Sequence, residues 1–178
     1  MFVLDRGFFS TENILQMAAG DENISFIQPL PFSLKKAKEL IKTHKRALND
    51  IGNNFTFNDE LLSHVRSELQ FKGQTCAVHI FLNEKAELDQ RQTFMKNLID
   101  IEENIIGQRV FKSLKKAMIF KEEKITKPYQ QFFKFNRSSG ALERNPRAIK
   151  ARLSRMGYFI LATNRDDMDK ETILSKYR

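Results

Sequence analysis

The residues best suited to chemistry lie in the segment 4–10, around Asp5. This aspartate lies at the carboxyl end of a strand that we expect to be buried, and it precedes a glycine turn at Gly7 and a helix start capped by Ser10, which is where α/β sheets bind ligands. A carboxylate there can bind Mg²⁺ or Mn²⁺, because these hard cations prefer oxygen ligands. A turn cap or an ion pair with Arg6 accounts for Asp5 equally well when only its neighbours are considered.

The common catalytic and metal-binding motifs do not occur in the sequence. It contains no CxxC pair, no HExxH, no glycine-rich phosphate loop and no GxSxG. The three histidines, His44, His64 and His79, lack the spacing typical of metal ligands. The single cysteine, Cys76, lies in an apolar run, which favours a buried core thiol over a nucleophile.

The positive charge of the chain is concentrated in one stretch. The 178 residues include 30 Lys and Arg and 22 Asp and Glu, a net charge of +8. From 109 to 155 there are 14 basic and 3 acidic residues, a net of +11, whereas the rest carries 16 and 19, a net of −3. Such a stretch is typical of a phosphate-contacting surface, because lysine and arginine release counterions from DNA, although a solvated face is the alternative. We expect non-specific contacts to the DNA backbone from Arg109, Lys112, Lys115, Lys116, Lys134, Arg137, Arg144, Arg147, Lys150, Arg152 and Arg155.

Aromatic residues are interleaved with this basic stretch: Tyr129, Phe132, Phe133 and Phe135. Alternating aromatic and basic side chains suit stacking on unpaired bases. The other interpretation places these rings in a core, which is the usual environment of phenylalanine. For the aromatic residues we favour the core interpretation. For the basic residues we give equal weight to a surface that contacts nucleic acid and to a solvated face.

The elements that must position these residues follow from apolar periodicity and turn signals. The first fifty residues alternate strand, helix, strand, helix, which is typical of parallel strands joined by crossovers. We expect strands starting at 2 and at 24–30, 74–82, 115–120, 131–136 and 158–163. We expect helices at 11–20, 33–48, 59–69, 84–106, 145–156 and from 170 onward, with a core stripe formed by Phe94, Leu98, Ile101 and Ile105.

Composition limits the class of protein. The apolar runs, such as 77–82, are far shorter than the roughly 20 residues of a membrane-spanning helix, so we expect no membrane partner. The 16 phenylalanines require burial, which excludes a chain that is disordered throughout. One cysteine cannot form an internal disulfide, and we therefore expect a reducing, cytoplasmic setting.

Both ends of the sequence resemble one family. The pattern Asp-Arg-Gly-Phe-Phe-Ser at 5–10, with the helix and strand expected after it, resembles the region around the second catalytic aspartate of DDE transposases of bacterial insertion sequences. The segments 157–164 and 173–178 are similar to the stretch just before the catalytic glutamate of those enzymes. The resemblance therefore involves two separated motifs in the same order as in the family.

The resemblance implies an α/β (mixed α+β) fold, with a partial ribonuclease-H-like core and a large insertion. It assigns 1–48 to the core, 49–156 to the insertion with its basic segment 109–155, and 157–178 to a return strand and the start of the glutamate region. The activity that it implies for the parent enzyme is metal-dependent cleavage and transfer of DNA strands in transposition. The implied cofactor is Mg²⁺ or Mn²⁺.

Only Asp5 matches one of the family's three metal-binding carboxylates; the first aspartate and the glutamate are expected upstream of 1 and beyond 178. The nearby acidic residues Asp166, Asp167 and Asp169 match no catalytic position, and we interpret them as a loop and helix-capping cluster. Strand transfer needs several carboxylates converging on two metal ions. We therefore expect a truncated transposase that binds DNA but neither holds the metal stably nor cuts DNA alone.

Two alternatives remain open at this point. The chain could be a non-catalytic DNA-binding or regulatory fragment that associates with full-length transposase, or an α/β protein of unrelated role. A partial sheet leaves a strand edge exposed, which predicts self-association or dependence on another fragment.

Overall fold

The computed structural model describes residues 1–178 except 6, 8, 11, 14–24 and 72. The chain forms two compact units: unit 1 comprises Met1–Glu87 and Gly157–Arg178, and unit 2 comprises Leu88–Met156. Most of the helix expected at 11–20, and the beginning of the strand expected at 24–30, lie outside the described residues.

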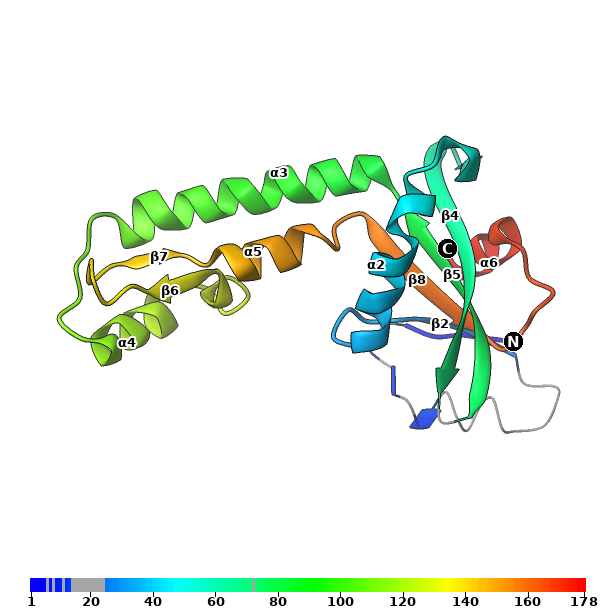
Figure 1. The fold of residues 1–178 in the computed structure, drawn as a ribbon, viewed down its shortest axis with the longest axis horizontal. Coiled ribbons are helices and arrows are strands. Elements are labelled where there is room, and N and C mark those ends of the chain that lie inside the picture. The colour runs from blue at the N-terminus through cyan, green and yellow to red at the C-terminus, as the bar shows by residue number, and fades with distance from the viewer. Residues whose placement is uncertain (6, 8, 11, 14–24, 72) are drawn as a thin grey trace. The chain divides into compact units, whose positions relative to one another are not determined.

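Unit 1 is built on a six-stranded sheet (Figure 1). Its order is β1-β2-β8-β5-β4-β3; β1 and β2 are parallel, and every other neighbouring pair is antiparallel. The strands are β1 (Phe2–Val3), β2 (Phe26–Pro29), β3 (Asn54–Phe57), β4 (Glu60–Phe71), β5 (Gln74–Leu82) and β8 (Tyr158–Thr163). The parallel first pair and the strands at 74–82 and 158–163 confirm the expectations from the sequence. The expectation that the first strand is buried is wrong, because β1 lies at the edge of the sheet and both of its residues are exposed.

The two faces of this sheet have separate hydrophobic cores, because side chains of a strand alternate between faces. Helix α2 (Lys35–Leu48) packs Leu40 and Ile41 on one face, in the cluster that contains Val78 and Ile160. Helix α6 (Lys170–Tyr177) packs Ile173 and Leu174 in the other cluster, with Phe81 and Leu161. The fold is therefore mixed α+β, as expected.

The helix expected at 59–69 is wrong, because this segment is strand β4. It pairs with β3 and β5, and its last nine residues align with the whole of β5. Leu61, Val65 and Leu69 recur every four residues, a spacing that also fits a helix. The signal for a strand was the dipeptide Asn58-Asp59, which adopts positive φ angles of 49° and 61° and joins β3 to β4 as a two-residue hairpin turn.

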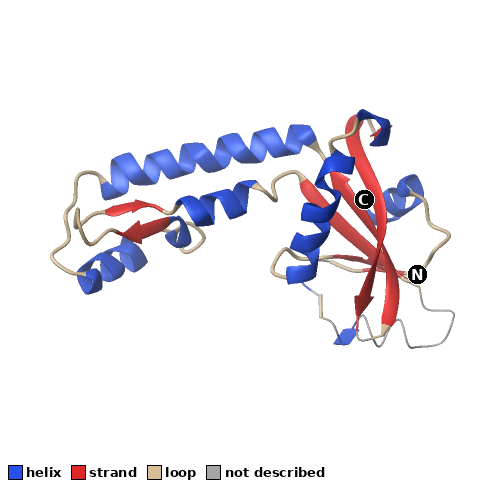
Figure 2. Cartoon of the chain, in the orientation of Figure 1, coloured by secondary structure: helices blue, strands red, loops and turns tan. Residues whose placement is uncertain are grey.

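Unit 2 consists mainly of helices with one short hairpin (Figure 2). The unit boundary falls within α3 (Glu84–Asp100), which continues as a π-helical segment, η3 (Ile101–Ile106). The remaining elements of unit 2 are α4 (Leu114–Lys124), the 3₁₀ turn η4 (Gln130–Phe132), β6 (Phe133–Phe135), β7 (Leu142–Arg144) and α5 (Pro146–Leu153). A second 3₁₀ turn, η2 (Ile51–Asn53), belongs to unit 1.

The core of unit 2 confirms the expected stripe on α3. Phe94, Leu98 and Ile101 are buried together, and Ile105 packs against them. The ring of Phe94 lies edge-on to that of Phe132, with 4.8 Å between the ring centroids. This core is formed by residues between Phe94 and Met156 and is therefore local in sequence.

The strand expected at 115–120 is also wrong, because these residues belong to helix α4. The backbone N–H of Lys116 donates to the hydroxyl of Ser113, which caps the helix. The apolar run 117–120 suggested a strand, but only Ala117 of α4 is buried. A short helix that covers a small core needs few buried positions, so the apolar periodicity of this segment did not indicate a helix.

The expected insertion 49–156 is divided between the two units. Residues 54–82 supply three strands of the unit 1 sheet, whereas 88–156 form unit 2 with a separate core. A ribonuclease-H-like core remains an expectation from the resemblance.

Candidate functional site

Asp5 lies beyond the carboxyl end of β1. Because β1 and β2 are parallel, their carboxyl ends share one edge of the sheet, which is the expected position for Asp5. The side-chain amide of Gln28 in β2 donates to the Asp5 carbonyl at 3.2 Å and to the Pro29 carbonyl at 3.1 Å. Gln28 is completely buried, and it therefore anchors the backbone of Asp5, whose side chain is exposed. Arg6, the alternative partner for Asp5, lies outside the described residues.

The described residues contain no cluster that would complete a metal site at Asp5. No group of three or more histidine, cysteine, aspartate or glutamate side chains positioned to hold a metal occurs among them. A cation on the Asp5 carboxylate alone would keep most of its water shell. The described residues therefore do not fit a resident Mg²⁺ or Mn²⁺.

The acidic loop before α6 has a structural role, as interpreted from the sequence. The carboxylate of Asp169 accepts from the Thr172 N–H at 2.7 Å and caps α6, and this hydrogen bond lowers the pKa of Asp169. Asp167 accepts from the guanidinium of Arg165, with one hydrogen bond of 2.8 Å, and the Arg165 contact lowers the pKa of Asp167. Arg66 donates to Asp166 at 3.2 Å.

A pair of histidines lies on the α6 face of the sheet, which the sequence analysis missed. Nε2 of His64 and Nδ1 of His79 are 3.0 Å apart, and the two rings are stacked with 5.1 Å between centroids. Burial, followed by the neighbouring His79, lowers the pKa of His64 to about 3. Burial, followed by Arg66, lowers the pKa of His79 to about 4. Both rings are therefore neutral at pH 7 and share one N–H···N hydrogen bond.

The histidine pair borders a surface cavity of about 380 Å³. The cavity is lined by His64, Arg66, His79, Asp166, Asp167, Met168, Asp169, Lys170 and Glu171. Nε2 of His79 is buried and has no hydrogen-bond partner among the described residues. In the sequence, the signal for this pair was two histidines on strands that pair as neighbours, and the helix expected at 59–69 concealed it.

Cys76 is a core thiol, as expected. It is fully buried on the α2 face of the sheet, and burial raises its pKa to about 11. A thiol with this pKa is almost entirely protonated at pH 7 and is a poor nucleophile.

The basic residues expected to contact DNA are mostly exposed on unit 2. Nine of the eleven have exposed side chains: Arg109, Lys112, Lys115, Lys116, Lys134, Arg137, Arg147, Lys150 and Arg152. Residues 88–156 contain 16 Lys and Arg and seven Asp and Glu, a net of +9, so the rest of the chain has a net of −1. Unit 2 therefore accounts for the whole positive net charge of the protein.

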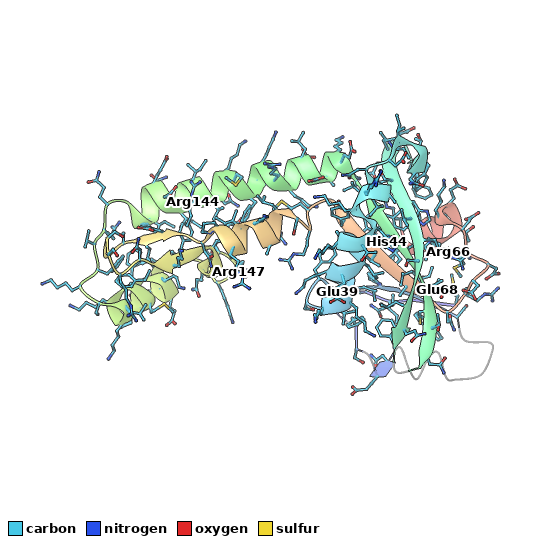
Figure 3. All side chains as sticks on the ribbon, viewed as in Figure 1. Glu39, His44, Arg66, Glu68, Arg144 and Arg147 are labelled. Carbon is cyan, nitrogen blue, oxygen red and sulfur yellow. The ribbon has the colours of Figure 1, made fainter. Side chains whose placement is uncertain are left out.

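Three of the eleven make contacts within unit 2. Arg144, labelled with Arg147 in Figure 3, is half-buried and forms an ion pair with Glu102 of η3. Arg109 donates to the carbonyls of Ile105 and Ile106 at the end of η3, at 2.7 and 3.0 Å. Nε of Arg155 donates to the Ala151 carbonyl at 2.7 Å. These three side chains contribute to the fold of unit 2, and the other eight are the stronger candidates for phosphate contacts.

The aromatic residues of the basic stretch belong to the core. Phe132 and Phe133 are buried, and Tyr129 and Phe135 are half-buried against the same cluster. The core interpretation of these rings is therefore confirmed.

Comparisons with protein-family models, with curated proteins and with solved structures gave no match to this chain. Among the described residues, no helix combines the length and the apolar character needed to cross a membrane.

Proposed function

We propose that this chain binds DNA through the phosphate backbone, using the exposed basic residues of unit 2. The observation that carries the proposal is the separation of charge: unit 2 has a net of +9 and the rest of the chain −1. Lysine and arginine side chains on a compact unit attract a polyanion by releasing its counterions. Among the residues that the structure describes, no element supports the reading of bases, and we propose non-specific binding.

We infer further that the protein derives from a DDE transposase of an insertion sequence. The support is the resemblance at 5–10, 157–164 and 173–178, together with the exposed Asp5 beyond the carboxyl end of a parallel strand pair. In this proposal, unit 2 contacts DNA, and Asp5 is the remaining ligand of a metal site that needs further carboxylates. The chain alone is then expected to bind DNA without cutting it.

DNA binding is tested by reversing charges that have no role in the fold. The triple variant Lys134→Glu, Arg147→Glu and Lys150→Glu should lower affinity for duplex DNA about a hundredfold at moderate salt and flatten the salt dependence. The matched control reverses Lys38, Lys42 and Lys45, which are exposed on α2 of unit 1. Fluorescence anisotropy over a salt series measures both quantities. Equal losses in the two variants, or binding that is independent of salt, would overturn the proposal.

The expected lack of cleavage activity has a separate test. The purified chain is incubated with supercoiled plasmid and Mn²⁺, and strand breaks are counted on a gel. We expect the wild type to nick no more plasmid than the Asp5→Ala variant does. Nicking by the wild type that Asp5→Ala abolishes would contradict the expected lack of activity.

A further inference from the structure

The outward face of α4 carries apolar side chains that the described part of unit 2 leaves uncovered. Met118 and Ile119 are 36% and 44% exposed, and Leu114 at the start of the helix is 48% exposed. Of the residues in α4, only Ala117 is buried. A helix of a small unit normally turns such side chains toward its core, so this face is suited to a partner.

Two opposite charges frame the apolar pair. Lys115 and Glu122 are exposed, and neither forms an ion pair with another described residue. They are seven residues apart, which is close to two helical turns, so both lie on the stripe that contains Met118 and Ile119. The order along the stripe is positive, apolar, apolar, negative.

The stripe on one α4 is complementary in charge to the same stripe on a second α4 that runs in the opposite direction. If two copies of α4 pack antiparallel about a two-fold axis between Met118 and Ile119, each Met118 lies level with Ile119 of the other copy. The same axis places each Lys115 level with Glu122 of the other copy, because both lie 3.5 residues from it. We propose that α4 is a dimerisation helix that binds the α4 of a second copy of this chain in this antiparallel arrangement.

A second copy fits this face better than DNA or a lipid surface. Glu122 and Glu123 are exposed at the end of α4 and would repel phosphates, whereas a second copy presents a lysine opposite Glu122. Two 11-residue helices bury less surface than the 1,200 Å² or so of a stable complex, so the dimer is weak. The net charge of +9 on each unit 2 opposes association, and a polyanion that neutralises it would favour the dimer.

The test uses charge reversal in the full chain, freed of nucleic acid, with sedimentation velocity up to about 100 μM protein and at about 0.15 M salt. Lys115→Glu places two glutamates opposite each other at each end of the helix pair, and Glu122→Lys places two lysines there. Each variant alone should weaken dimerisation about tenfold. Lys124→Glu makes the same charge change as Lys115→Glu, away from the stripe, and serves as the control.

Mixing the two variants gives the decisive result. In a heterodimer of Lys115→Glu with Glu122→Lys, both ends of the helix pair are again complementary, so dimerisation should return to the wild-type level. A wild type that stays monomeric over the whole range would overturn the proposal. So would a mixture that associates no better than the separate variants, or an equal loss in Lys124→Glu. Because nucleic acid is absent, this outcome does not depend on the DNA-binding proposal.

Discussion

The cores of unit 1 and unit 2 differ in how far apart in the sequence their elements lie. Unit 1 joins strands that are far apart in sequence, since β8 pairs with both β2 and β5. Unit 2 packs helices and a hairpin from one continuous segment around a single core. The charge differs in the same way, at −1 for unit 1 and +9 for unit 2. The core that depends on long-range strand pairing and the surface that carries the positive charge therefore belong to different units.

The largest expected effect concerns the return of the chain to unit 1 at Gly157. This glycine has φ of +77°, and an added Cβ would lie 2.7 Å from the Asn83 carbonyl oxygen and 2.6 Å from Cβ of Glu87. Gly157→Ala should lower the free energy of unfolding by about 4 kcal/mol, from backbone strain and the clash together. Urea denaturation measures the loss.

Gly73 provides the matched control for that substitution. It also has positive φ, of +93°, but an added Cβ would meet no atom within 4 Å. Gly73→Ala should therefore cost only about 1 kcal/mol of strain. Equal costs at the two glycines would show that the close approach to Asn83 does not contribute.

The independence of the two cores is tested in unit 2. Leu98 is completely buried, and Leu98→Ala should destabilise unit 2 by about 3 kcal/mol through the cavity that it leaves. Hydrogen exchange should show faster exchange at 88–156 and unchanged protection of β4 and β5. A uniform loss of protection across both units would mean that they unfold together and would weaken the comparison.

The third effect is a pH dependence of stability that we expect in unit 1 and not in unit 2, because all three histidines lie in unit 1. The pKa values of His64 and His79 in the folded protein, about 3 and about 4, are below the ordinary value of 6.5. The unfolded chain therefore binds more protons below pH 6.5, and unit 1 loses stability as the pH falls from 6.5 toward 4. Each of the two histidines should contribute a loss of about 2 kcal/mol by pH 5, measured by urea titration at each pH.

The double variant His64→Asn and His79→Asn should flatten this dependence between pH 6.5 and 5. Unit 2 lacks histidine, so its protection from exchange should not change in that window. A parallel decline of both units would assign the pH effect to carboxylates shared by the whole chain.

The smallest effect compares the helix caps of the two units. Asp169 accepts from Thr172 at 2.7 Å in unit 1, and Ser113 accepts from Lys116 at 3.4 Å in unit 2. Asp169→Ala should cost about 1 kcal/mol and Ser113→Ala about half as much, because the first cap is shorter and also places a negative charge at the helix N-terminus. Thermal melts resolve both values. The reverse order would contradict this explanation.

The sequence predicted the strands whose ends are marked by strong turn signals. The apolar run 74–82 and the segment 158–163 after Gly157 matched the observed strands, because both are nearly fully buried. The stripe Phe94, Leu98 and Ile101 identified the core of unit 2, since a long helix repeats its signal over several turns.

The errors have a common physical cause, which is that short segments carry ambiguous periodicity. Spacings of four at Leu61, Val65 and Leu69 fit a helix, but pairing with β5 fixed the segment as a strand. The same applies to the site residues. Charge counting located the basic unit, whereas the contact of His64 with His79 depends on register between strands, which local sequence does not reveal.

The central position of β8 in the sheet has a consequence for synthesis on the ribosome. β1 and β2 share no hydrogen-bonded neighbour with β3, β4 and β5 until β8 inserts between β2 and β5. The sheet of unit 1 therefore stays incomplete in the nascent chain while residues 88–156 emerge. During that interval, one edge of β2 and one edge of β5 lack a partner strand and are open to chaperones, and the sheet of unit 1 is completed only when β8 pairs with both.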